Sequence, residues 1–462
     1  MKKTLLRCFR GVWLLWSFVL TSTLVIALAA LAFFEYSSLR ALDPDQIALM
    51  PAPDLIASGA YQPFQEPLRV AKPDDFGVFY ATDRAPAIDA DAERYYTSER
   101  GHVLRVGVAQ VRLGEQQITW EEAARIAREK DREREYPLRV ADAREFGVLR
   151  DTLTPFDAAA KQATEAESQA TSLDEEFIHR VNEKLRSSHR KELVIYVHGY
   201  KVVFENPLLV ATELWHYLGY DGVFLAYSWP STPNFAAYFS DLETAAYSSR
   251  NLRILIESLA RETEVERIHV LGYSAGTRLV LGAVNQISLL NHDATDQELQ
   301  DRYRLGTVVL ACSDVDRQIF GNQLADGAWR VPSQWTVYLS ELDSTLDMAR
   351  MVFGRKRLGR LVEGDVVSPA LADFLRSQNR FSLVDVSRAE NADANNGHAY
   401  FHKSPWVSSD LLLTFATSLP PGERGLVKKG DSPLWEFPDD YVARLGSLAN
   451  LPSNQGDAPD AD

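Results

Sequence analysis

The chain has 462 residues, of which 46% are hydrophobic and 24% are charged, so it is long enough to bury a large core. Its net charge of −15 argues against nucleic acid or anionic lipid head groups as partners, because both repel an acidic body. The two cysteines, Cys8 and Cys312, lie on opposite sides of a hydrophobic segment, which excludes a disulfide framework.

The N-terminal segment predicts a membrane anchor. Residues 1–10 contain Lys and Arg but no acidic residue, and residues 11–34 form an uncharged apolar run that is long enough to cross a bilayer core of about 30 Å. Because basic flanks stay cytoplasmic, we expect a single-pass protein of a bacterial inner (cytoplasmic) membrane, with its body on the periplasmic or extracytoplasmic side. Cleavage near the small residues that end the run is the alternative.

Residues 35–75 are rich in proline, alanine and aspartate and predict a linker. Residues 76–189 predict a small α+β extension that packs on the core. Its strands are expected at 76–84 and 103–112, and its charge-dense helices at 119–134 and 157–188.

Strands and helices alternate between residues 190 and 417. The expected strands are apolar throughout, which is typical of a mostly parallel sheet with helices on both faces, an α/β fold. The strands are expected at 192–197, 222–228, 267–271, 307–312, 335–340 and 381–386. The helices are expected at 206–218, 240–261, 276–290, 344–352 and 369–377. Proline, glycine and acidic residues then predict a C-terminal tail over 418–462, with a disordered end.

A Gly-x-Ser-x-Gly pattern, formed by Gly272, Ser274 and Gly276, lies between an expected strand and an expected helix. This order is typical of a nucleophile elbow, a sharp turn that raises a serine above the sheet. The flanking glycines let the strand and the helix approach without side-chain clashes. We therefore predict that Ser274 is a nucleophile. The alternative is a glycine-rich turn in which Ser274 caps the helix.

A serine nucleophile needs a base, and the base needs an orienting carboxylate. After an elbow of this kind the acid precedes the histidine along the chain. His398, in the loop after the last expected strand, is the candidate base, and a surface-loop histidine is the alternative. Asp343 is the candidate acid, although it would equally suit the cap of the next helix. Asp314 and Asp316, which follow the preceding strand, are the alternative acids.

An oxyanion hole requires two backbone N–H groups. One is expected from Ala275, the residue after the nucleophile, and the other from the loop after the strand 192–197. In that loop Gly199 allows a tight turn that would aim the amide of Tyr200 or Lys201 at the oxyanion.

Neither a cofactor nor a metal is expected. The sequence has no metal-type cysteine cluster. His398 and His402 have the spacing of a metal pair on a helix, but no third ligand motif stands near them.

Several motifs together resemble a family of bacterial α/β-hydrolases of unknown function, catalogued as DUF900, over residues 76–415. They are Phe79–Arg84, His198–Tyr200, Tyr227–Ser231, Tyr238–Asp241, Gly272–Gly276, Leu310–Asp316 and Gly397–Phe401. The resemblance implies an α/β-hydrolase fold and a triad of Ser274, an aspartate and His398, and it brings no known substrate. The family's usual His-Ser-Met in the elbow is Tyr273-Ser274-Ala275 in this chain.

These features predict a membrane-anchored serine hydrolase that cleaves an ester, a lipid ester, a thioester or an amide through an acyl-enzyme. The expected substrate is an acyl-containing small molecule or lipid. Acyl transfer to an acceptor other than water would use the same residues. The alternative function is a catalytically silent scaffold or binding protein at the cell envelope.

Overall fold

A computed structural model describes most of the chain from residue 46 to residue 447. The described residues are 46–64, 77–88, 91, 93–114, 118–149, 152, 154, 173–362, 373–375, 377–417 and 419–447, together with Trp16 and Thr21. Within these residues no helix has the length and apolarity needed to cross a bilayer. The predicted basic segment at 1–10, the end of the predicted tail and, apart from Trp16 and Thr21, the predicted anchor at 11–34 lie outside the described residues.

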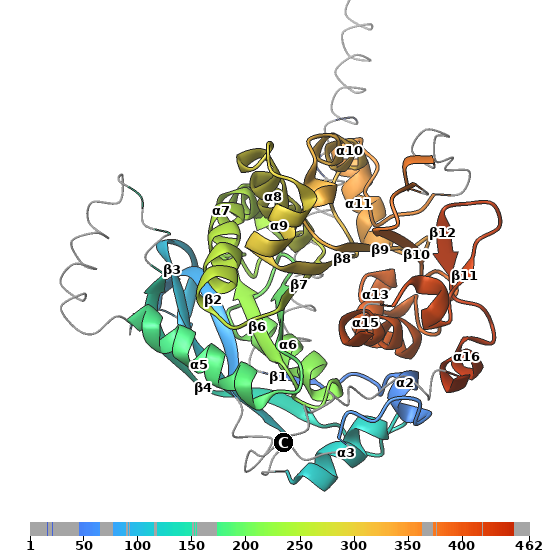
Figure 1. Ribbon diagram of the computed structural model, residues 1–462, viewed down its shortest axis with the longest axis horizontal. Helices are drawn as coiled ribbons and strands as arrows, with labels where there is room; N and C mark the ends of the chain where they lie inside the picture. The colour runs from blue at the N-terminus through green and yellow to red at the C-terminus, as the bar shows by residue number, and fades with distance from the viewer. Residues whose placement is uncertain are drawn as a thin grey trace, which may run out of the picture.

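A sheet of twelve strands runs through the molecule in the order β1-β4-β3-β2-β6-β5-β7-β8-β9-β10-β12-β11 (Figure 1). Pairing is parallel from β2 through to β12 and antiparallel at both ends of the sheet. The strands are β1 (Gln46–Ala48), β2 (Gly77–Pro86), β3 (Tyr96–Leu113), β4 (Pro137–Leu149), β5 (Glu192–Val197), β6 (Val223–Ser228), β7 (Arg267–Tyr273), β8 (Leu305–Ala311), β9 (Gln334–Leu339), β10 (Phe381–Asp385), β11 (Val427–Lys428) and β12 (Leu434–Glu436).

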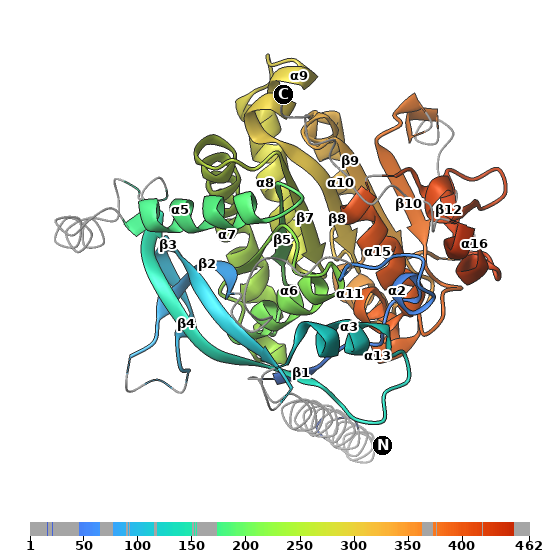
Figure 2. The same cartoon turned by 60° about the horizontal axis from the view of Figure 1, so that its bottom comes forward.

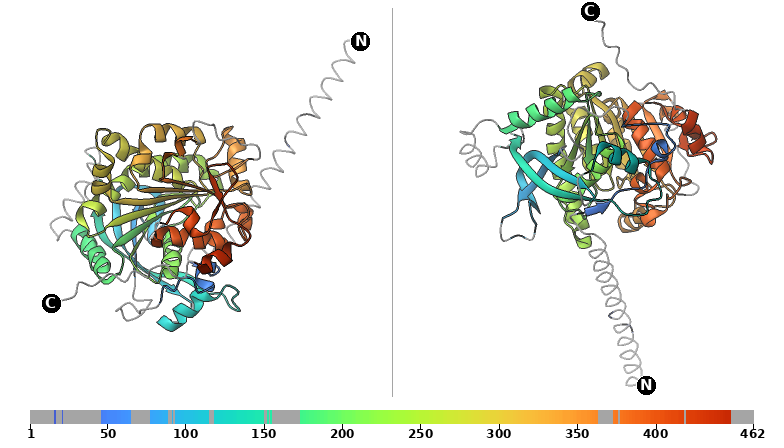
Figure 3. Two further views of the ribbon diagram at one scale, coloured as in Figure 1. Left: turned by 45° about the vertical axis from the view of Figure 1, so that its right-hand side comes forward. Right: turned by 90° about the horizontal axis from the view of Figure 1, so that it is seen from below.

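Helices cover both faces of this sheet, and each face has its own apolar core (Figure 3). One core packs α5 (Leu173–Ser187), α7 (Tyr238–Glu262), α8 (Gly276–Leu290), α9 (Asp296–Tyr303) and α10 (Arg317–Ala325). The other core packs α2 (Asp54–Ala57), α3 (Trp120–Arg128), α6 (Glu205–Tyr217), α14 (Tyr400–Lys403), α15 (Pro405–Thr417) and α16 (Tyr441–Ser447). Two further helices, α11 (Ser344–Phe353) and α13 (Ala394–Gly397), follow β9 and β10. The predicted α/β architecture is confirmed.

All six strands predicted between residues 190 and 417 are present, each within two residues of its predicted ends. The sequence did not indicate α15, because this helix is buried on nearly all sides and so lacks an amphipathic period. It also did not indicate β4, whose central part alternates half-buried and exposed residues that include charged ones. The predicted helix at 369–377 lies partly outside the described residues, and residues 373–375 and 377 are helical.

The N-terminal extension is part of the central sheet. Strand β2 pairs in parallel with β6, where Phe79 lies opposite Leu225, and β3 and β4 continue the sheet outward (Figure 2). Part of the predicted linker also packs on the core. The backbone N–H of Met50 donates to the buried carboxylate of Glu213 at 2.5 Å. Residues 46–64 are therefore an integral layer of the fold.

Part of the predicted tail is likewise structured. Strand β12 adds to the sheet beside β10, and the buried Arg424 bonds to the buried carboxylate of Asp410 in α15 at 2.7 Å. Burial opposes the charge on Arg424, but the Asp410 carboxylate raises the pKa of the guanidinium above its ordinary value. Because either charge left alone would be costly to bury, this pair ties residues 419–447 to the core.

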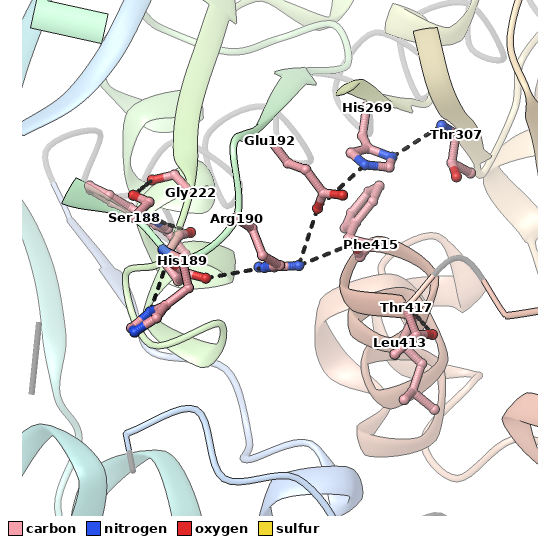
Figure 4. Close-up of polar contacts among 12 residues, drawn as sticks. Ser188, His189, Arg190, Glu192, Gly222, His269, Thr307, Leu413, Phe415 and Thr417 are labelled. Atoms are coloured by element: carbon pink, nitrogen blue, oxygen red, sulfur yellow. Dashed lines mark hydrogen bonds and ion pairs between the residues drawn. The ribbon is translucent and has the colours of Figure 1, made fainter. Parts of the chain in front are cut away.

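A polar cluster joins the beginnings of β5, β7 and β8 to the end of α15 (Figure 4). Arg190 donates both to the carboxylate of Glu192 and to the carbonyl of Phe415. The same carboxylate lies 3.8 Å from the buried ring of His269, whose Nδ1 accepts from the backbone of Thr307 at 3.1 Å. The cluster lies at the edge of the sheet where these parallel strands begin, opposite the edge at which Ser274 follows β7.

Candidate active site

Ser274 occupies a sharp turn between β7 and α8. Its φ of 52° is in the left-handed region, which a residue with a Cβ occupies only when its surroundings enforce it. Close packing provides this enforcement. A Cβ added at Gly272 would lie 3.0 Å from the Val280 side chain, and one added at Gly276 would collide with the His198 carbonyl. Both glycines are therefore needed for the helix to start so close to the sheet.

The structure brings Ser274, His398 and Asp343 together from three separate loops. The Nε2 atom of His398 lies 2.9 Å from the Ser274 hydroxyl, and its Nδ1 atom lies 2.8 Å from Oδ2 of Asp343. Asp343 is fully buried, and its other oxygen accepts from the backbone N–H of Leu346 at 2.9 Å, which caps α11. One carboxylate therefore both contacts the histidine ring and caps the helix.

The loop that carries His398 is held against Asp343 by its backbone. Gly397 has a φ of 72°, and a Cβ at this position would collide with the carbonyl of Leu342. The Tyr273 hydroxyl donates to the carbonyl of His398 at 2.8 Å, and the Cys312 thiol lies 3.2 Å from the same oxygen. Burial raises the pKa values of Tyr273 and Cys312 well above their ordinary range, so both groups remain protonated donors.

The two alternative acids have other partners. Asp314 accepts from the Tyr238 hydroxyl at 2.5 Å and from Arg278 at 3.1 Å. Asp316 caps α10 by accepting from the backbone N–H groups of Gln318 and Ile319 at 2.7 and 3.2 Å. Both aspartates follow β8, as the sequence indicated. However, the Asp314 side chain binds Arg278, and the Asp316 side chain caps α10.

The loop after β5 lies against Ser274. A Cβ at Gly199 would be 3.0 Å from the Cβ of Ser274, so the backbone approaches as closely as a glycine allows. The backbone amide of Lys201 bonds to Asp241, which leaves the Tyr200 amide as the candidate donor from this loop. Ala275, the other candidate donor, is buried at the N-terminal end of α8, where backbone N–H groups lack helical acceptors.

The buried residue His198 packs at the start of this loop. The ring of His198 stacks on that of Trp229 at 5.2 Å, and the indole N–H of Trp229 donates to the His198 carbonyl at 2.8 Å. Burial, with a smaller contribution from Arg84, lowers the pKa of His198 to about 3. This imidazole is therefore neutral at pH 7 and acts as a packing element beneath the loop.

Arg84, from β2 of the extension, donates hydrogen bonds to backbone carbonyls of the same loop and of the loop after β6. Its buried guanidinium donates to the Val202 carbonyl at 2.7 Å, to the Ser231 carbonyl at 3.2 Å and to the Ser228 hydroxyl at 3.1 Å. Burial lowers its pKa to about 10, so the group keeps its charge at pH 7. In the sequence this arginine is marked only by its place in the Phe79–Arg84 motif.

The aromatic residues near the site divide into two groups. Phe204 and Trp229 are core residues with almost no exposure. Tyr200 and Tyr238 are half-buried, with ring centroids 5.0 Å apart, and Tyr238 also contacts Phe353 of α11 at 5.8 Å. Burial, together with Asp314 and Asp241, raises the pKa of Tyr200 to about 12, so its hydroxyl stays protonated. An aromatic wall thus leads from the loop after β5 to α11.

One group of side chains has the composition of a metal site. Cys312, Asp343 and His398 offer ligand atoms that all lie within 4.8 Å of one another. Both ring nitrogens of His398 are already hydrogen-bonded, and the raised pKa of the Cys312 thiol opposes the thiolate that a metal needs. The group does not fit a metal ion. His402 contacts Glu213 at 3.7 Å instead of pairing with His398.

Comparison with known proteins bears on this geometry. A family model described as an alpha/beta hydrolase of unknown function (DUF900) matches residues 174–414, which is more than half of the chain. The matched part contains Ser274, Asp343 and His398, whereas Arg84 lies before it. Searches of curated proteins and of solved structures found no match.

Proposed function

Because the chain belongs to this family of α/β hydrolases of unknown function, as its motifs predicted, we propose that it is a serine hydrolase. The observation that carries the proposal is the continuous path of hydrogen bonds from the Ser274 hydroxyl through His398 to Asp343. This arrangement has the geometry that activates a serine, with each contact between 2.6 and 3.2 Å. A structural role alone would not require a strained serine beside a histidine.

The proposed reaction passes through an acyl-enzyme. The Ser274 oxygen attacks the substrate carbonyl carbon while its proton passes to Nε2 of His398, and Asp343 holds the imidazole and stabilises the imidazolium. The amides of Ala275 and Tyr200 donate to the oxyanion. His398 then returns the proton to the leaving group, and a water molecule, activated in the same way, releases the acid. The substrate class is an ester, a lipid ester, a thioester or an amide.

We also propose that residues 11–34 anchor the protein in the cytoplasmic membrane, with the body on the periplasmic or extracytoplasmic side. The support is the length of the uncharged run and the basic residues before it.

Labelling with a fluorophosphonate probe tests both parts of the proposal. The full chain should be labelled, and the labelled band should sediment with the membrane fraction. Ser274→Ala and His398→Ala should abolish the labelling, whereas His402→Ala, four residues further on, should retain it. A folded wild-type chain without labelling would favour a scaffold that has lost turnover. A labelled chain that stays in the soluble fraction would contradict the anchor.

A further inference from the structure

Helix α11 exposes an apolar face. Met348, Met351 and Val352 are all exposed, and Met351 is 71% accessible. Their spacing of three and four residues places them on one side of the helix. An amphipathic helix normally turns such a face toward the core, but the buried residue of α11 is Leu346.

Neighbouring elements extend this face. Phe239 at the start of α7 is 59% exposed, and its ring lies 5.5 Å from that of Phe353. Leu342 is exposed just before α11, and Ile319 is exposed in the first turn of α10, where the backbone N–H of Arg317 donates to the Lys356 carbonyl at 3.1 Å. The apolar rim comprises six residues, Phe239, Ile319, Leu342, Met348, Met351 and Val352. Six large apolar side chains around one helix form a patch of the kind that marks an interaction surface.

Basic residues border the apolar rim. Residues 344–362 contain five basic residues and one acidic residue, but Arg357 is buried against Asp314, so four of the five can contribute to the surface charge. The acidic residue, Asp347, already pairs with Arg360 at 2.6 Å and with Arg350 at 3.4 Å. Arg355 and Lys356 are exposed at the end of the helix. Among the acidic groups nearby, Asp314 and Asp316 are buried and Glu341 faces Lys429 at 3.6 Å, whereas Asp393 beside α13 and Glu243 of α7 are exposed.

We propose that the apolar rim docks on the surface of an anionic bilayer. Exposed apolar side chains on a short helix with flanking cations match the chemistry of the interface, where acyl chains lie below anionic head groups. The net charge of the whole chain predicts the opposite, but the exposed Arg355 and Lys356 make the end of α11 locally basic. Within about a Debye length of the membrane the charges closest to it dominate the attraction.

Docking would place the candidate active site at the membrane surface. Helix α11 begins immediately after Asp343, and the Ser344 hydroxyl donates to the Asn396 carbonyl in the His398 loop at 3.3 Å. The aromatic wall of Tyr200, Tyr238 and Phe353 connects the rim to the loop beside Ser274. The binding inference itself does not depend on the reactivity of Ser274.

A site-specific fluorescent label tests the docking on the full chain. In a Cys8→Ser background, in which the remaining Cys312 is buried, Met351→Cys is labelled with an environment-sensitive dye. Leu290→Cys, at an exposed apolar position at the end of α8, is the matched control. Vesicles of phosphatidylcholine with phosphatidylglycerol should blue-shift the label at position 351, and spin-labelled acyl chains should quench it. The label at position 290 should not respond.

Charge reversal tests the electrostatic part. Arg355→Glu with Lys356→Glu should abolish the response to phosphatidylglycerol, whereas Arg134→Glu with Arg144→Glu, which changes the net charge equally on another face, should preserve it. Equal responses with and without phosphatidylglycerol would overturn the proposal. So would a label at position 351 that stays in water, or a shift that grows with protein concentration without vesicles, which would indicate a second copy as the occupant. None of these readouts requires catalysis.

Discussion

At the scale of single residues, Asp343 combines an orienting carboxylate with a helix cap, and one substitution separates the two. In Asp343→Asn the amide oxygen can still accept from the Leu346 N–H, while the amide nitrogen faces His398 and imposes the wrong tautomer. We expect the rate of fluorophosphonate inactivation to fall by about 10³ to 10⁴. The free energy of unfolding should change by no more than about 1 kcal/mol.

Asp314→Asn is the matched control for this experiment, because Asp314 is a buried aspartate nearby that binds arginine and tyrosine. Inactivation rates and denaturant unfolding curves of both variants provide the comparison. Equal losses of rate in the two variants would show that Asp343 has no special part in the reaction.

At the scale of elements, the left-handed turn at Gly397 brings the His398 loop to Asp343. Gly354, which ends α11, has a similar φ of 63°, but a Cβ at this position would meet nothing within 4 Å. Alanine at either position should therefore cost about 1–2 kcal/mol of backbone strain. Only Gly397→Ala should also displace the loop, because its Cβ collides with Leu342.

We thus expect Gly397→Ala to lose probe labelling and more unfolding free energy than Gly354→Ala, which pays only the backbone strain and keeps the labelling. Thermal unfolding and labelling of the two variants measure this difference. If both variants label at the wild-type rate, the turn at Gly397 does not set the position of His398.

The sequence predicted the elements that carry the site because their signals are local. The strand, the glycine-flanked turn and the helix around Ser274 are contiguous, and the six core strands are continuous apolar runs. By contrast, no local signal distinguishes Asp314, Asp316 and Asp343 as partners of the histidine. All three follow strands, and the direction of each side chain depends on contacts with residues far away in the chain, such as Arg278 and His398.

Supporting residues such as Arg84 leave no local signal in the sequence for the same physical reason. The contact of Arg84 with Val202 joins residues that lie more than a hundred positions apart, and no periodicity in the sequence records it. The contact of Tyr273 with the His398 carbonyl is equally remote, although the sequence had marked position 273 as a departure from the usual pattern of the family. Tertiary contacts of this kind follow from the fold and not from local propensity.

At the scale of the whole molecule, buried histidines make stability dependent on pH. Burial, with a smaller effect of Arg132, lowers the pKa of His216 to about 3, and His198 is lowered to a similar value. In the unfolded chain these groups titrate near pH 6.5, so between pH 6.5 and 3 the unfolded state binds more protons. Their contribution is complete above pH 6.5 and is lost as the pH falls, at about 1.4 kcal/mol per pH unit for each histidine.

His216→Phe tests this dependence, since the ring of His216 already packs among the aromatic rings of Phe64, Tyr217 and Tyr220. Between pH 6 and pH 4 the free energy of unfolding of this variant should fall less steeply than that of the wild type, by about 1.4 kcal/mol per pH unit. Between pH 7 and pH 8 the two curves should run parallel. Denaturant unfolding at stepped pH measures both regions, and identical slopes in acid would contradict the assignment.

The contact between Arg84 and the Val202 carbonyl limits how far the N-terminal part of the chain can be truncated. Residues 174–414 carry Ser274, Asp343 and His398, yet they lack β2 and the arginine that it contributes. In a fragment limited to those residues, β6 would be an unpaired edge strand that could pair with other chains. The carbonyls of Val202 and Ser231 would also lose the hydrogen bonds that Arg84 donates. The region matched by the family model is therefore smaller than the unit that shares this sheet, and we expect a fragment limited to residues 174–414 to be less stable than the chain that includes β2.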